Sequence, residues 1–125
     1  MHNSLEIARL TAEAACEKKA FDTLILDLRG LTYVADFFVI CSGSNTTQVG
    51  AVSDGIEQML AREGVRSSHI EGRAGSAWVL MDYGDVVVHI FDQQTRVYYS
   101  LEKLWHDAPR MPLAAHARAL ADRSS

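Results

Sequence analysis

The chain has 125 residues, with 12 lysines and arginines against 16 aspartates and glutamates, so its formal net charge at pH 7 is −4. This length fits one domain whose core needs neither disulfides nor metal. The acidic balance excludes a general nucleic-acid binder, because affinity for the phosphate backbone comes from clustered lysine and arginine.

The sequence also excludes a membrane helix and predicts a cytoplasmic protein. The longest unbroken apolar runs, residues 37–41 and 77–81, have five residues each, whereas a membrane-spanning helix needs about 20. The first ten residues contain no apolar segment of the kind that signal peptides have. The two cysteines, Cys16 and Cys41, form no C-x-x-C motif and no disulfide framework.

In chain order, the sequence first predicts a helix and two strands. Residues 5–19 are rich in good helix formers and place several alanines on one face, which predicts an amphipathic helix. Residues 23–28 predict a short strand. Residues 36–41 predict a second strand that is central in its sheet, because both of its sides are apolar.

A turn and a second helix follow the central strand. Asn45 is a suitable N-cap, and Gln48 stands three residues later, as in a capping box. The apolar stripe of this helix ends before Gly64, a suitable residue for the position after the helix. Residues 66–71 then predict a short edge strand.

Two apolar runs, residues 77–82 and 85–91, predict a β-hairpin with a two-residue turn at residues 83–84. This hairpin has one purely apolar face, which we expect to pack on helices. Its other face combines aromatic residues with histidine and aspartate. The predicted cross-strand pairs are Trp78 with His89, Leu80 with Val87, and Asp82 with Asp85.

The mixed face of the hairpin has two interpretations. It is either a partly covered face, in which Trp78 fills a gap beneath the C-terminal segment, or a surface that binds a partner. The second interpretation rests on the preference of interface hot spots for tryptophan and tyrosine ringed by polar groups.

The segment after the hairpin, residues 96–105, predicts one or two short helices that could extend the mixed face. Two prolines end the compact region, so we expect residues 1–108 to form the domain. Residues 109–125 would be a C-terminal extension, either a marginal helix or mobile. Val97, Leu101, Leu104 and Trp105 are predicted to form a core stripe, whereas Tyr98, Tyr99 and Glu102 are predicted to be exposed.

The Gly43-Ser44 dipeptide follows a predicted strand and opens a predicted helix. Helix N-termini bind phosphate, so this place could hold a nucleotide, although an ordinary capped turn explains the same residues. Phosphoryl transfer also needs converging carboxylates for Mg²⁺. Asp82 and Asp85 are the only close acidic pair on strands, and aspartate is common in turns for local hydrogen-bonding reasons.

Other catalytic parts are missing from the sequence. The five histidines have no metal-ligand spacing, and Cys41 has no adjacent histidine to activate it. The chain also contains no P-loop, no G-x-S-x-G motif and no G-x-G-x-x-G motif. We therefore predict a protein that is not an enzyme and that uses no metal or cofactor.

Taken in order, three blocks of the sequence resemble the iojap-like ribosomal silencing factor family over about residues 5–108. The blocks are DFFVICSGS at residues 36–44, AWVLMDYGDVVVH at residues 77–89 and RVYYSLEKLW at residues 96–105. The resemblance implies an α/β fold, with a mixed β-sheet flanked by α-helices. That fold would be related to nucleotidyltransferases but would lack their catalytic carboxylates.

The resemblance also implies a function that needs no chemistry. Members of this family bind the large ribosomal subunit through its ribosomal protein fourteen, at the intersubunit face. There they block joining of the small subunit, which represses translation when nutrients are scarce, and related proteins serve assembly of the large subunit in organelles. Free members are often homodimers. The partner-binding residues implied by the matching motifs are Trp78, Leu80, Asp82, His89, Tyr98, Tyr99, Leu101, Glu102 and Trp105.

Overall fold

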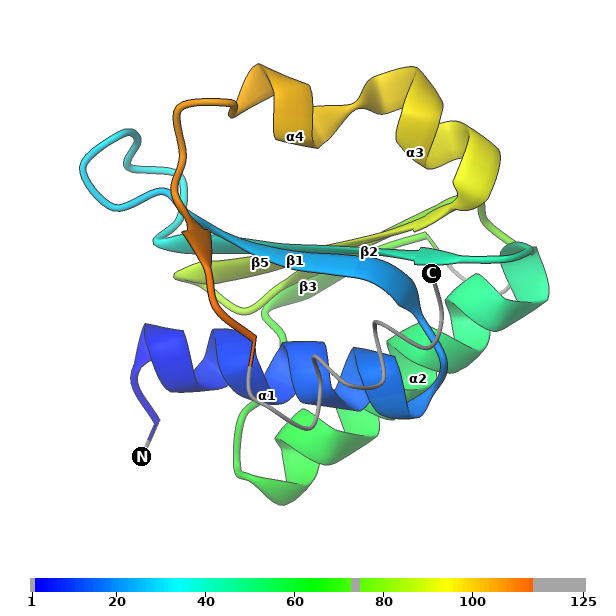
Figure 1. The fold of residues 1–125 in the computed structure, drawn as a ribbon. Helices are drawn as coiled ribbons and strands as arrows, with labels where there is room; N and C mark the ends of the chain where they lie inside the picture. The colour runs from blue at the N-terminus through cyan, green and yellow to red at the C-terminus, as the bar shows by residue number, and fades with distance from the viewer. Residues whose placement is uncertain (1, 73–74, 114–125) are drawn as a thin grey trace.

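The computed structural model describes residues 2–72 and 75–113 and shows a six-stranded sheet with helices on both faces (Figure 1). The strand order is β3-β4-β5-β2-β1-β6. The helices are α1 (Ser4–Glu17), α2 (Thr46–Arg62), α3 (Gln93–Tyr99) and α4 (Leu101–Leu104). The strands are β1 (Phe21–Asp27), β2 (Phe37–Gly43), β3 (His69–Glu71), β4 (Trp78–Asp82), β5 (Val86–Asp92) and β6 (Arg110–Met111).

The sheet is mixed because β2 and β5 run parallel, whereas the other neighbouring strands are antiparallel. Every residue of β2 is buried, which confirms the predicted central strand. The predicted α/β fold with a mixed, helix-flanked sheet is therefore confirmed. The finer relation to nucleotidyltransferases stays a prediction.

The long helix α2 begins and ends as its sequence predicts. The Asn45 side chain accepts a hydrogen bond from the Gln48 backbone N–H at 2.8 Å, which satisfies one of the free donors of the first turn. At the other end, Gly64 takes a φ of +80°, the left-handed conformation that follows many helices. The buried residues of α2 face the sheet together with the alanines of α1.

Part of the predicted C-terminal extension belongs to the sheet. Arg110 and Met111 form β6, a two-residue edge strand that pairs with Leu26 and Ile25 of β1. This short strand has no hydrophobic alternation that could reveal it in the sequence. Residues 114–125, where the sequence predicts a marginal helix or a mobile segment, lie outside the described residues.

The hairpin forms, but its predicted register is wrong by two residues. Trp78 pairs with Phe91, Leu80 with His89, and Asp82 with Val87. The two-residue turn lies at Gly84-Asp85, because type II′ turns place glycine at the first turn position and Gly84 has a φ of +85°. A shift of two residues preserves the side-chain faces, so the predicted apolar and mixed faces are still correct.

The two faces of the sheet have separate cores. The apolar side of the hairpin packs with β1 and β2 against α1 and α2, around buried residues such as Val79, Val88 and Ile90. The mixed side packs beneath α3 and α4, where Phe38 and Phe91 are buried (Figure 1). The second core is the smaller one, and short helices cover it.

Replacing Ile90 by alanine tests the larger core. This side chain is fully buried on β5, so the Ile90→Ala variant should lose about 2–5 kcal/mol of unfolding free energy in urea titrations. The Val97→Ala variant is the control, because Val97 is 73% exposed and should lose less than about 0.5 kcal/mol. Equal losses in the two variants would contradict the assigned core.

Candidate functional site

An aromatic layer lies between the sheet and the short helices α3 and α4. Trp78 of β4 packs against Phe91 of β5 and against Tyr99 of α3, with ring centroids 4.9 and 4.7 Å apart. Farther along the sheet, Phe38 contacts His89 at 4.6 Å and Trp105 at 6.0 Å. His89 also contacts Trp78 and Phe91, so residues of β2, β4, β5 and α3, with Trp105 after α4, form one continuous cluster beneath the short helices.

His89 lies inside this aromatic layer, where it is 4% exposed. Its Nδ1 atom accepts a hydrogen bond from the Trp78 indole Nε1–H at 3.3 Å. Burial in this apolar setting lowers the pKa of His89 to about 4, so the imidazole is neutral at pH 7. In this conformation His89 has no surface for a partner and instead orients the Trp78 ring.

The other predicted partner-binding residues differ in how much of their surface is free. Tyr98 and Tyr99 are exposed, as predicted. Glu102 is only partly exposed, contrary to its prediction, because its carboxylate pairs with Arg96. Half-buried positions are held by Trp78, Leu80, Asp82, Leu101 and Trp105.

The predicted core stripe along residues 96–105 is half wrong. Leu101 and Trp105 pack against the smaller core, as predicted, but Val97 and Leu104 are 73% and 70% exposed. The reason is a break at Ser100, whose left-handed backbone (φ 47°, ψ 52°) separates α3 from α4. Residues on the two sides of Ser100 therefore do not share one face, as they would in a single continuous helix.

The exposed apolar residues of the two short helices form what we call the α3–α4 surface, defined by Val97, Tyr98, Tyr99 and Leu104. Beside it is an open cavity of about 440 Å³, with Trp78 in its wall. Within this surface Tyr98 and Tyr99 are in contact, and adjoining exposed apolar side chains mark interaction sites. The lining residues of this cavity are Ala77, Trp78, Gln94, Thr95, Tyr98 and Tyr99.

The Gly43-Ser44 turn uses its hydrogen-bonding groups within the chain. The backbone N–H and the hydroxyl of Ser44 both donate to the Gln48 side-chain oxygen, at 2.6 and 2.8 Å. A Cβ atom at Gly43 would approach the Val49 backbone nitrogen to 3.0 Å, so the glycine serves local packing. This geometry favours the capped turn over the nucleotide-binding interpretation.

The remaining candidate catalytic groups have structural surroundings. The Asp82 carboxylate accepts from the Gly84 N–H at 2.8 Å, as a turn residue does. Burial raises the pKa of the Cys41 thiol to about 12, which disfavours a thiolate nucleophile. Across residues 2–72 and 75–113, no three histidine, cysteine or acidic side chains gather where they could hold a metal ion.

No helix within the described part of the chain is long and apolar enough to cross a membrane.

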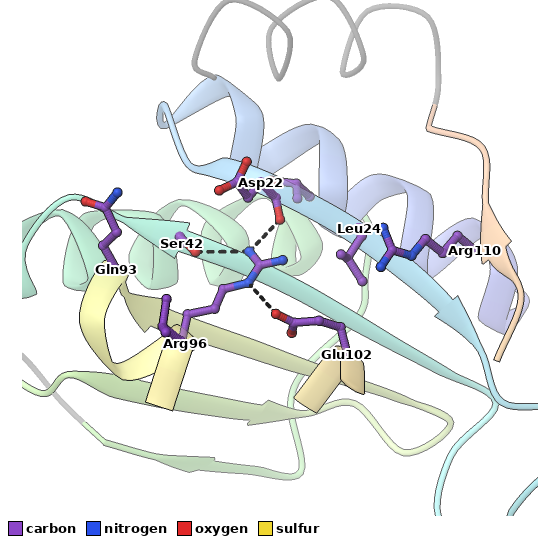
Figure 2. A pocket seen from close by; sticks show the side chains of 9 residues that line it. Asp22, Leu24, Ser42, Gln93, Arg96, Glu102 and Arg110 are labelled. Atoms are coloured by element: carbon purple, nitrogen blue, oxygen red, sulfur yellow. Dashed lines mark hydrogen bonds and ion pairs between the residues drawn. The ribbon is translucent and has the colours of Figure 1, made fainter. Parts of the chain in front are cut away.

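Sequence reasoning missed one buried residue of this region, Arg96. It is 8% exposed beneath α3 and contacts β1, β2 and α4 (Figure 2). The signal that could have found it is an arginine directly before three apolar or aromatic residues, 97–99, with a possible carboxylate partner at Glu102. A buried charge needs such a partner or hydrogen bonds.

The depressed pKa of His89 predicts a specific loss of stability in acid. The pKa is about 4 in the folded chain and near 6.5 when unfolded. The unfolded chain therefore binds the additional proton between these values, and the free energy of unfolding should fall as the pH is lowered through them. One proton gives a slope of at most about 1.4 kcal/mol per pH unit.

Urea titrations between pH 4 and 7 would measure this slope. The His89→Gln variant cannot titrate, so it should show a shallower pH dependence than the unmodified protein. The His106→Gln variant is the control, because it makes the same substitution at a side chain that is 76% exposed. The same pH dependence in all three proteins would rule out a buried, neutral His89.

Comparison with known proteins identifies one family, both from a family model and from individual relatives. The family model described as "Ribosomal silencing factor during starvation" matches residues 1–125. The ribosomal silencing factor RsfS of Bacillus subtilis is 44% identical over 107 residues, which cover 86% of this chain and 91% of that protein. The RsfS protein of Halalkalibacterium halodurans is 41% identical over 108 residues, covering 86% and 92%.

Solved structures agree with the fold. An X-ray structure of a Chromobacterium violaceum protein superposes with a TM-score of 0.81 at 33% identity, covering 93% of this chain and 96% of that one. A Bacillus halodurans crystal structure gives a TM-score of 0.77 at 37% identity, covering 88% and 100%. The described family function is regulatory, which agrees with the predicted absence of enzymatic activity. The chain therefore belongs to the RsfS family of ribosomal silencing factors.

Proposed function

We propose that this protein represses translation by binding the large ribosomal subunit through ribosomal protein fourteen, at the intersubunit face. In that position it blocks joining of the small subunit when nutrients are limited. Membership of the ribosomal silencing factor family supports the coarser part of this proposal, a translation repressor that acts on the ribosome. The α3–α4 surface is the observation that supports the finer part.

The α3–α4 surface has the composition of a docking site. Tyr98 is 81% exposed and stacks edge-on against Tyr99, with ring centroids 5.1 Å apart. Tyr99 in turn rests on Trp78, so a partner would meet aromatic side chains that are already held in place. Such preorganised aromatic anchors contribute most of the binding energy in many interfaces.

The net charge fits a protein partner better than an RNA partner. The chain has a formal net charge of −4, so the phosphate backbone of ribosomal RNA would repel it on average. A basic ribosomal protein would attract it, since complementary charge raises the rate of association. Occupying that protein at the joining face requires no catalytic group.

We also propose that the free protein is a homodimer. The same exposed apolar side chains that would bind the ribosomal protein could pair with a second copy of the chain. Binding to the ribosome would then compete with dimerisation, and sedimentation of the free protein with and without purified ribosomal protein fourteen would detect this competition.

Replacing Tyr98 by alanine should weaken binding to large subunits by about ten-fold or more, because hot-spot truncations cost about 2 kcal/mol or more. The Trp78→Ala variant should also lose affinity, since Tyr99 packs on the Trp78 ring. The measurement is co-sedimentation of each variant with separated ribosomal subunits. Circular dichroism spectra would confirm that both variants are folded.

Tyr33→Ala provides a matched control. Tyr33 is fully exposed on the loop between β1 and β2, and this loop contains none of the residues that define the α3–α4 surface. The control should follow the large subunit as the unmodified protein does. If Tyr98→Ala and Trp78→Ala bind as tightly as Tyr33→Ala, the docking surface is misplaced, and if no protein follows the large subunit, the proposed function fails.

A further inference from the structure

A second cavity, with a volume of about 480 Å³, opens between β1, β2 and the two short helices (Figure 2). It adjoins the α3–α4 surface at Val97, but it shares no lining residue with the cavity beside Trp78. Its size is suitable for a small metabolite. The lining residues are Asp22, Thr23, Leu24, Ser42, Gln93, Arg96, Val97, Glu102 and Arg110.

The floor of this cavity holds the buried guanidinium of Arg96. Its Nη1 atom donates to the backbone carbonyl of Asp22 and to the Ser42 hydroxyl oxygen, the latter at 3.0 Å. The Asp22 carbonyl is available because β1 has a β-bulge there, with Asp22 at a φ of +50°. A β-bulge changes the direction of backbone and side-chain groups on its strand, and here the Asp22 carbonyl is directed toward Arg96.

The charge of Arg96 is only weakly compensated. Its single carboxylate partner, Glu102, lies 3.5 Å from Nε, which is longer than the 2.7–2.9 Å of a strong charge-assisted bond. Among the described residues, none accepts a hydrogen bond from Nη2, and Figure 2 shows this nitrogen directed toward the side of the cavity where Arg110 lies. A buried cation with free donors favours an incoming anion.

Arg110 supplies a second positive group from β6. Its guanidinium also lines the cavity, and in Figure 2 it ends beside Leu24, which lies between it and Arg96. It forms no ion pair with any described carboxylate. The Asp22 carboxylate, in contrast, points away from Arg96 in this view. Two arginines therefore line one cavity, together with the acidic residues Asp22 and Glu102.

Glu102 adds a requirement for a hydrogen-bond donor. Its Oε2 atom is buried and accepts no hydrogen bond within the described part of the chain. We propose that this cavity binds a small phosphate ester that also carries hydroxyl groups. The phosphate would accept hydrogen bonds from Arg96 and Arg110, as arginine pairs do, and a hydroxyl would donate to Glu102.

Ribose 5-phosphate is a suitable probe, with inorganic phosphate and ribose as its two halves. Titration calorimetry on the free protein should show saturable binding of ribose 5-phosphate, weaker binding of phosphate and none of ribose. The Arg110→Gln variant should weaken the binding of ribose 5-phosphate about ten-fold, which corresponds to about 1.4 kcal/mol. In NMR titrations, the side-chain N–H signal of Arg96 should shift with saturation.

The Arg66→Gln variant is the matched control. It removes the same charge from an exposed arginine that precedes β3, at the opposite edge of the sheet, and should bind like the unmodified protein. The proposal is overturned if ribose 5-phosphate does not bind, if ribose binds equally well, or if both arginine variants lose affinity equally. The test uses no ribosomes, so its failure would leave the proposed function standing.

Discussion

The rest of the fold follows from the burial of the central strands β2 and β5 on both faces. All seven residues of β2 are buried, and so are all of β5 except Asp92. A sheet that is buried on both faces requires two covering layers, because apolar side chains left in contact with water would contribute no hydrophobic stabilisation. The long helices α1 and α2 cover one face. The short helices α3 and α4 cover the other and retain apolar side chains on their outer side.

That thin second layer explains why aromatic residues and a buried arginine gather there. The rings of Trp78, Phe91 and Tyr99 fill the space that longer helices would fill elsewhere. Arg96 ties α3 to β1 and β2, and through Glu102 it also contacts α4. The same layer can therefore be both a structural cover and a surface for a partner. Its proposed role requires shape and position rather than a reacting group.

Much of the fold could be predicted from the sequence, because its signals are local. The caps of α2 and the two-sided burial of β2 follow directly from residue types. The predicted hairpin register is wrong because it places the turn at Tyr83-Gly84. The observed turn, Gly84-Asp85, places the glycine at the first position, where φ is positive. The strand β6 is too short to have a pattern of its own.

The candidate site was predicted less completely, because burial there depends on tertiary contacts. His89 looks like a surface residue in a mixed strand, yet Phe38 and Trp78 enclose it. Val97 and Leu104 look like core residues until Ser100 breaks the helix. Glu102 was predicted to be exposed, but its carboxylate pairs with the buried guanidinium of Arg96. The exposure of Tyr98 and Tyr99 was predictable, since neither belongs to the apolar stripe of the segment.

The proposed function is that the protein prevents ribosomal subunits from joining by occupying the large subunit. Light scattering of purified subunits, mixed with the large subunit already saturated by this protein, tests it most directly. Formation of whole ribosomes should fall in proportion to the occupied fraction of large subunits, with no nucleotide or metal added beyond the buffer that joining itself needs. Subunits that join at the same rate and to the same extent, while the protein remains bound, would contradict it.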